Sequence, residues 1–238
     1  MTHKIDRRDL VIGTAAGIAA IGASAALPIV GAAQAAAPAA KPGYEPKPLG
    51  LDPKAIKGLS EKIITSHYDN NYKGAVARVG SIQGEVAKLD MATAPGFVLN
   101  GLKREELMAI NSMILHEVYF ASLGAGGEPT GDLASALTRD FGSVAAWRNE
   151  FTATGKALGG GSGWVLLTYS PRMGRLVNQW AADHSMTIAD GIHVLALDMY
   201  EHAYHMDFGA RAAAYVDAFM GAINWTNVAA AYTAASRR

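Results

Sequence analysis

A carboxylate and an imidazole, four residues apart, follow an apolar run in the stretch Val194-Leu195-Ala196-Leu197-Asp198-Met199-Tyr200-Glu201-His202-Ala203-Tyr204. The apolar run at 194–197 predicts a buried strand. Asp198 and His202 would then emerge where that strand ends, close to the protein interior. An ionised carboxylate in such a place needs a partner charge or a metal ion. The stretch therefore predicts a charged or metal-binding site at the end of a strand.

Two further histidines, His67 and His116, lie on apolar stripes of predicted helices. Ser60 is a predicted N-cap of the first helix. The stripe of the second helix repeats at helical spacing and consists of Ala109, Met113, His116 and Phe120. Either histidine alone is more simply a buried core side chain bonded to the backbone, and this alternative stays open. Together with the Asp198 stretch, three imidazoles and one carboxylate suit a first-row transition metal such as iron or manganese.

The first 35 residues have the pattern of a cleaved export signal. The pair Arg7-Arg8 opens a basic start, an Ala- and Gly-rich apolar stretch follows, and Ala33-Gln34-Ala35 offers a signal-peptidase site. The arginine pair resembles a bacterial twin-arginine signal, although Asp6 stands where Ser or Thr is more common. A transmembrane anchor is the alternative, which the high Gly and Ala content disfavours. We expect an exported protein, periplasmic or secreted, with no membrane contact after cleavage and a flexible leader at 36–50.

Composition excludes several classes of function. Without its first 35 residues the chain keeps 203 residues and a net charge of −1, which argues against nucleic acid as a partner. The sequence contains no cysteine, so disulfides, zinc–thiolate sites and cysteine nucleophiles are excluded.

Helical patterns dominate up to about residue 158, and strand patterns begin after residue 162. Beyond the first helix, the predicted helices cover about 102–122, 131–140, 143–158, 209–222 and 225–235. The predicted strands cover 164–169, 175–180 and 194–198, the first two as a hairpin. We expect an α+β fold, with an N-terminal helical hairpin domain at 51–125. A C-terminal domain at 126–238 would contain a three-stranded antiparallel sheet and flanking helices.

In their order along the chain, these motifs resemble landmarks of the iron/manganese superoxide dismutases. His67-Tyr68 and His116 resemble the two helical metal ligands of that family, and the Asp198 stretch resembles its metal-binding signature. The other landmarks are Gly126–Gly131, Phe141–Ser143, Gly161–Trp164, Glu201–Tyr204 and Ile223–Trp225. The resemblance covers about residues 50–235, nearly the whole chain after the predicted signal.

The resemblance implies a superoxide dismutase that converts superoxide to hydrogen peroxide and dioxygen. It implies one iron or manganese ion per subunit, without choosing between the two metals, held by His67, His116, Asp198 and His202. Trp164 and Tyr200 would wall the catalytic pocket, with plain core aromatics as the alternative. His184 would be the outer-sphere residue that tunes the metal, with an exposed loop histidine as the alternative.

A subunit interface is also implied by the resemblance. In the family, the glutamate at the position of Glu201 reaches a ligand histidine of the partner subunit across a two-fold axis, so we expect a homodimer or a tetramer. His205 stands where an interface tyrosine is usual, and Asn71 stands where a histidine of the first ligand helix is usual. In the family, this tyrosine and this histidine are partners at the interface. We hypothesise that Asn71 and His205 form a hydrogen bond in their place, with the histidine now on the other side of the pair.

Other positions depart from the family pattern. Ala75 replaces the tyrosine that gates substrate access, and Ala212 replaces an arginine that attracts the anion. Tyr72 lies three residues before Ala75 and is predicted to supply a phenol in another geometry. A metal-binding relative with weak or altered redox activity is therefore the alternative function. A different oxidase or peroxidase chemistry would need a cavity opened by Ala75.

Overall fold

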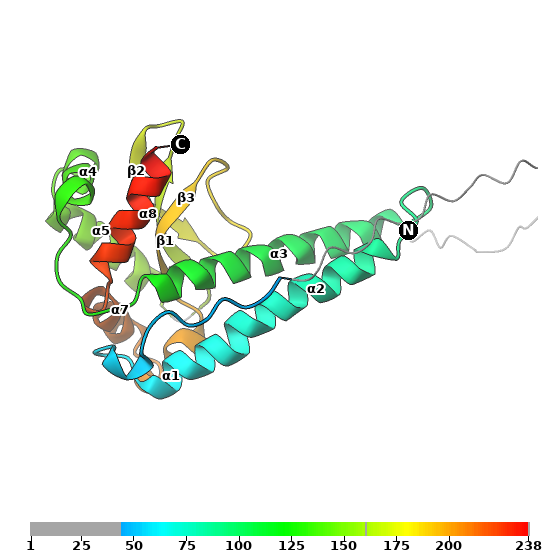
Figure 1. Cartoon of the computed structure of the whole chain (residues 1–238), viewed down its shortest axis with the longest axis horizontal. Helices are drawn as coiled ribbons and strands as arrows, with labels where there is room; N and C mark the ends of the chain where they lie inside the picture. Colours follow the sequence, from blue (N-terminus) through cyan, green and yellow to red (C-terminus); the bar gives the residue numbers. More distant parts are fainter. Residues whose placement is uncertain (1–43, 160, 238) are drawn as a thin grey trace, which may run out of the picture. The chain divides into compact units, whose positions relative to one another are not determined.

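The computed structural model describes residues 44–159 and 161–237, which belong to one compact unit. The predicted signal at 1–35 and the leader up to residue 43 lie outside the described residues. Helices and a three-stranded sheet are combined in the described part (Figure 1), which confirms the predicted α+β class. The predicted division of this part at residue 125 stays a prediction. In the described ranges, every helix is too short or too polar to cross a membrane.

The first ligand helix begins as predicted and then widens. The short turn η1 (Pro53–Ala55) precedes α1 (Glu61–Ser66), whose N-cap Ser60 accepts a hydrogen bond from the backbone N–H of Ile63 at 3.1 Å. The backbone continues through the π-helical segment η2 (His67–Tyr72) into α2 (Lys73–Ala87). Side-chain periodicity did not predict this π-helical segment, which begins at the predicted ligand His67. Short π-helical segments within α-helices often lie at functional sites.

The second ligand helix, α3 (Gly96–Ala121), lies beside α2 and forms a long helical hairpin with it (Figure 1). It begins six residues before the predicted start, directly after Pro95, which stands at its N-cap. Away from the main core, Val79, Ile82 and Ala109 form a small apolar cluster between the two helices. The hairpin therefore has its own packing along the part that extends from the sheet.

The sheet has the order β2-β1-β3 and is antiparallel throughout. Its strands are β1 (Trp164–Ser170), β2 (Arg175–Ala181) and β3 (Ile192–Asp198). Trp164, the first residue of the central strand, pairs with Asp198, the last residue of β3. This register places an aromatic wall and a carboxylate at the same edge of the sheet.

Helices cover the sheet and bury it. α3 and α8 (Trp225–Ser236) pack against β3, α5 (Val144–Ala157) packs against β1, and α4 (Gly131–Phe141) packs against β2. After β3 the chain forms the turn η3 (Glu201–Ala203), the short helix α6 (His205–Phe208) and α7 (Ala212–Gly221). The predicted helix at 209–222 is therefore shorter than expected. The single turn α6 was missed because four residues carry no clear periodicity.

Gly163 sets the start of the central strand. Its φ is 131°, and a Cβ at this position would lie 2.3 Å from the carbonyl oxygen of Ala181. Its own carbonyl oxygen accepts a hydrogen bond from the backbone N–H of Met199 at 2.9 Å. Only glycine combines this backbone angle with so close an approach, so Gly163 helps to fix Trp164 beside the residues after Asp198.

His193 is a polar side chain between the sheet and the loop that precedes β3. Its Nδ1 lies 3.0 Å from the hydroxyl of Thr168, and its Nε2 lies 3.2 Å from the hydroxyl of Thr187. Burial lowers the pKa of His193 to about 4. The ring is therefore neutral in the folded protein at neutral pH, where it joins two hydroxyl groups.

We expect His193 to make the protein less stable in weak acid. The unfolded chain binds this proton near pH 6.5, whereas the folded chain resists it until about pH 4. The stabilisation is thus complete above pH 6.5 and is lost as the pH falls from 6.5 to 4. Urea unfolding at pH 6.5, 5.5 and 4.5 should show a shallower loss in His193→Asn than in the unchanged protein. Parallel losses in the two proteins would contradict this assignment.

Candidate metal centre

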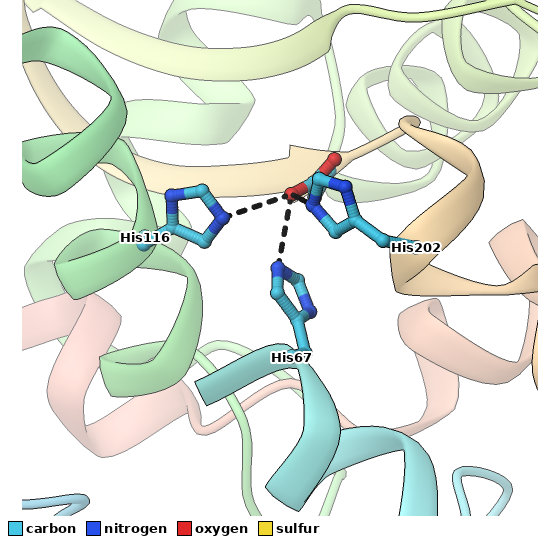
Figure 2. A group of neighbouring side chains, drawn as sticks. His67, His116 and His202 are labelled. Carbon is cyan, nitrogen blue, oxygen red and sulfur yellow. Dashed lines mark hydrogen bonds and ion pairs between the residues drawn. The ribbon is translucent and has the colours of Figure 1, made fainter. Parts of the chain in front are cut away.

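Four side chains from four separate segments converge on one point. His67 comes from η2, His116 from α3, Asp198 from the end of β3, and His202 from η3. One ligand atom from each lies within 4.8 Å of every other. Figure 2 shows the rings of His67, His116 and His202 directed towards the same place. The structure thus brings together all four of the predicted metal ligands.

The carboxylate of Asp198 is the centre of this group. Its Oδ2 lies 3.2 Å from Nε2 of His67, 3.6 Å from Nε2 of His116 and 3.2 Å from Nε2 of His202. The side chains of His67 and His116 are 1% exposed, and that of Asp198 is fully buried. His202 is the most accessible of the four, with 27% of its side chain exposed.

The unpaired nitrogens of this group fit a metal ion. Nε2 of His67 and Nε2 of His116 are buried and have no hydrogen-bond partner among the described residues. A buried polar atom without a partner destabilises a protein by about 1–3 kcal/mol. A transition-metal ion satisfies both lone pairs at once, and histidine with carboxylate is a donor set suited to iron or manganese. The four residues therefore fit one such ion better than they fit a purely structural cluster.

The protonation states also suit a metal ion. Burial lowers the pKa of His67, and burial followed by repulsion from His67 lowers the pKa of His116 to about 3. Burial acts to raise the pKa of Asp198, but attraction to the imidazoles of His202 and His67 outweighs it, so the pKa is lowered. Neutral imidazoles and an ionised carboxylate are the forms that bind metals.

Main-chain contacts orient the ligands. Nδ1 of His116 donates to the carbonyl oxygen of Ser112, one turn earlier in α3, at 2.6 Å. This leaves Nε2 of His116 free to face the centre, since a hydrogen bond at one ring nitrogen fixes the role of the other. Oδ1 of Asp198 accepts from the backbone N–H of Tyr200 at 2.8 Å, which leaves Oδ2 for the centre. Sequence patterns did not predict this contact, because any residue at position 112 would supply the same carbonyl oxygen.

Three of the predicted catalytic residues lie beside the ligands. The ring of Trp164 is fully buried and meets His116 edge-on at 5.4 Å between centroids. The indole N–H of Trp164 donates to Nδ1 of His184 at 2.9 Å. Tyr200 stacks on His184 at 4.8 Å and on His202 at 5.5 Å. The structure therefore places Trp164, His184 and Tyr200 in one layer beside the ligands, and their catalytic roles stay predictions.

The structure does not bring Tyr72 to the ligands. Its hydroxyl donates to Oε1 of Glu117 at 3.0 Å and accepts from the backbone N–H of Lys47 at 2.8 Å. The Tyr72 ring packs against Phe120 and Tyr68. Tyr72 lines a pocket with Lys47 and Glu117, whereas Ala75 lines the cleft that contains His184. The catalytic role of Tyr72 therefore stays a prediction without a supporting contact.

We expect Tyr72→Phe to change stability but not turnover. Loss of the hydrogen bond to Glu117 should lower the free energy of unfolding by about 0.5–1.5 kcal/mol. Turnover and its pH profile should stay unchanged, because the hydroxyl contacts no ligand and burial helps to raise the pKa of Tyr72 to about 12. Thermal melting and steady-state assays of the two proteins would measure both effects. A loss of turnover at unchanged metal content would restore Tyr72 as a candidate catalytic residue.

The predicted interface residues lie outside this cluster. Glu201 and His205 are exposed, and Asn71 is half-buried. No hydrogen bond joins Asn71 to His205 within the described part of the chain. Their interface roles stay predictions.

A cleft leads from the surface towards the second ligand helix. It has a volume of about 530 Å³, and Ala75, Arg78, Ser112 and His184 are among its lining residues. Ala75 is the position where the family places a gate tyrosine, so the cleft is wider here than that larger side chain would leave it. Arg78 is a cation in the cleft that sequence reasoning missed, and it is paired with Glu105.

Comparisons with known proteins agree with this geometry. The sequence pattern of iron/manganese superoxide dismutases, C-terminal domain, matches residues 129–231. Superoxide dismutase [Fe] of Cupriavidus metallidurans is 69% identical over 194 residues, covering 82% of this chain and 98% of that protein. Superoxide dismutase [Fe] of Aquifex pyrophilus is 34% identical, covering 74% and 84%. Superoxide dismutase [Mn] 2 of Haloferax volcanii is 32% identical, covering 79% and 95%.

The fold and the site together define a class of protein. An α+β chain with three histidines and one aspartate around one buried point is a mononuclear metalloprotein whose donors suit iron or manganese. The identity to the Cupriavidus protein extends over nearly all of that protein's length. This chain belongs to the iron/manganese superoxide dismutase family.

Proposed function

We infer that the protein is a superoxide dismutase with one iron or manganese ion per subunit. It converts two superoxide anions and two protons into one molecule each of dioxygen and hydrogen peroxide. The observation that carries this conclusion is the buried group of His67, His116, Asp198 and His202 in a chain 69% identical to a superoxide dismutase. Because that relative is named as an iron enzyme, we favour iron over manganese.

The metal, when bound, supplies reversible one-electron chemistry. The protein binds the metal, keeps water away from it and supplies protons. The rings of Trp164 and Tyr200 pack together, with Trp164 against His116, and keep water away from this side of the site. His184 holds a proton at a defined atom. Because an indole N–H can only donate, Nδ1 of His184 must accept from Trp164, so the neutral ring carries its proton on Nε2. Burial lowers the pKa of His184, which favours this neutral form.

Superoxide turnover of the purified protein, normalised to iron and manganese content per chain, tests this function. High turnover that follows the content of one metal supports the dismutase and names its metal. One metal ion per chain with negligible turnover would overturn it.

The alternative is a relative that kept the metal but altered the chemistry. The cleft beside Ala75 favours it, because this cleft is open where the family has a tyrosine. Ala75→Tyr distinguishes the two functions. A dismutase that works without the gate should gain little superoxide turnover from the added tyrosine. A large gain, together with peroxide-dependent oxidation of phenols by the unchanged protein, would support the alternative.

We propose that the chain is exported by the twin-arginine route and acts in the periplasm or outside the cell. The support is the sequence alone: Arg7-Arg8, the apolar stretch after it and the cleavage pattern at Ala33-Gln34-Ala35. Expression in a bacterial host with cell fractionation and N-terminal sequencing tests this proposal. The mature form should begin near residue 36 in the periplasm, and Arg7→Lys with Arg8→Lys should keep the precursor in the cytoplasm. Export of that double variant at the unchanged rate would contradict the proposal.

We also propose that the protein is a homodimer. Glu201 supports it, because this carboxylate is exposed next to the partly exposed ligand His202, where a second subunit could reach both. Sedimentation analysis should give twice the chain mass or a multiple of that value. Glu201→Gln should weaken the association and Asp217→Asn should not. A monomer at micromolar concentration would contradict the proposal.

A further inference from the structure

The loop at 182–191 connects β2 to β3 and carries His184 to the metal centre. The His184 ring is fixed on two sides, by the hydrogen bond from Trp164 and by the stack on Tyr200. Its centroid lies 6.3 Å from that of the ligand His116. The position of the loop backbone therefore decides how the ring meets the ligands.

Packing alone does not hold this loop against α3. A cavity of about 210 Å³ lies between them, and Asn111, Leu115, His184 and His193 are among its lining residues. A cavity of this size leaves room for the loop to shift, because its walls lack the contacts that close packing provides. Directed polar contacts must then fix the distance between the loop and the helix.

Asn111 supplies such a contact. Its side-chain Nδ2 donates to the carbonyl oxygen of His184 at 2.7 Å. Among the described residues, this is the hydrogen bond that joins α3 to the loop at 182–191. Asn111 is also next to Ser112, whose carbonyl oxygen orients the ring of His116. Neighbouring residues on one turn of α3 thus hold a ligand histidine and an outer-sphere histidine.

We propose that Asn111 is a positioning residue, which holds the main chain of His184 so that its ring stays between Trp164 and Tyr200 beside the ligands. It acts on the metal centre only through His184. Loss of the amide should let the loop move into the cavity and loosen the Trp164–His184 hydrogen bond. The catalytic consequence rests on the proposed function, whereas the geometric consequence does not.

A matched control exists at the other end of the same loop. Nε2 of Gln179 donates to the carbonyl oxygen of Met186 at 3.2 Å, and its Oε1 accepts from the backbone N–H of Ile188 at 3.3 Å. Gln179 therefore anchors the loop with two hydrogen bonds but does not contact His184. Gln179→Ala should lower stability without changing the metal centre.

The first measurement is the indole N–H spectrum of the zinc-loaded protein, because zinc is not redox active and has a filled d shell. Four tryptophans give four indole signals, and Trp164→Phe assigns the one of interest. Asn111→Ala should move the Trp164 signal and leave those of Trp147 and Trp225 in place. An unmoved Trp164 signal would overturn the proposal, and so would an equal shift of all four signals or a similar Trp164 shift in Gln179→Ala.

The second measurement is the midpoint potential and the turnover per metal of the iron-loaded protein. Asn111→Ala should keep its iron and shift the potential, with turnover lower by about 3- to 10-fold, less than loss of a direct outer-shell partner costs. In a His184→Ala background, Asn111→Ala should have no further effect on the potential. An additive effect in that background would overturn the route through His184.

If the Asn111→Ala variant does not fold, Asn111→Asp keeps the shape of the side chain without the N–H donor. If the protein has no dismutase activity, the midpoint potential and the Trp164 indole signal still test the proposed role of Asn111.

Discussion

Asp198→Asn is expected to abolish stoichiometric metal binding and superoxide turnover. Asp198 places one oxygen 3.2–3.6 Å from three histidine nitrogens and carries the negative charge of a buried group. Asparagine keeps the shape but removes that charge, so three neutral imidazoles would face a cation without a compensating carboxylate. Loss of an outer-shell partner alone costs about 10- to 100-fold in affinity or activity. Replacing the ligand itself should exceed the upper end of that range.

Metal content per chain and turnover per chain measure this effect. Asp217→Asn is the matched control, because Asp217 is 61% exposed and pairs with Lys156 on the surface. The control should keep one metal ion per chain and the unchanged turnover. Asp198→Asn with full metal content would show that the four residues do not form the metal site.

Metal removal is expected to lower the melting temperature substantially. Without the ion, Nε2 of His67 and Nε2 of His116 are buried and lack hydrogen-bond partners in the part of the chain that the structure describes. A ligand that binds only the folded state stabilises it by about 4 kcal/mol at 1,000 times its dissociation constant. For a chain of this size, 1 kcal/mol corresponds to about 2–4 °C in melting temperature. We therefore expect chelation to lower the melting temperature by about 8–16 °C.

Calorimetry of the metal-loaded and the chelated protein measures this difference. Asp198→Asn is the control, because a protein that binds no metal should melt at the same temperature with and without the chelator. A melting temperature of the unchanged protein that chelation does not move would contradict a metal bound at this buried group.

Local patterns predicted the start of the first helix, the helix that carries His116 and the strand that ends at Asp198, but they predicted neither η2, which carries His67, nor η3, which carries His202. Ser60 predicted a helix start because a capping side chain and the N–H it binds are three residues apart. The run at 194–197 predicted a buried strand ending at Asp198, and β3 ends there. Boundaries were less accurate: α3 begins at Gly96 and the helix predicted at 209–222 begins at Ala212. Helix ends depend on capping and on neighbours that periodicity does not record.

The resemblance extended the prediction from elements to a site. His67, His116, Asp198 and His202 were assigned by family likeness, and the structure gathers them at one point. Residue spacing alone would not have placed His67 beside Asp198, which comes 131 positions later in the chain. Tyr72 was predicted separately, from its place three residues before Ala75, and its hydroxyl contacts Glu117 instead of a ligand.

Local spacing and residue chemistry were enough to predict most element types, and the resemblance to a family supplied the four donor residues. The contacts between individual atoms became known only from the three-dimensional structure. It showed that the Ser112 carbonyl orients His116, that the Tyr72 hydroxyl faces Glu117, and that a cleft opens beside Ala75. It also showed that Asn111 reaches the backbone of His184, 73 residues away in the chain. Such contacts depend on how distant segments pack, and no local pattern encodes that packing.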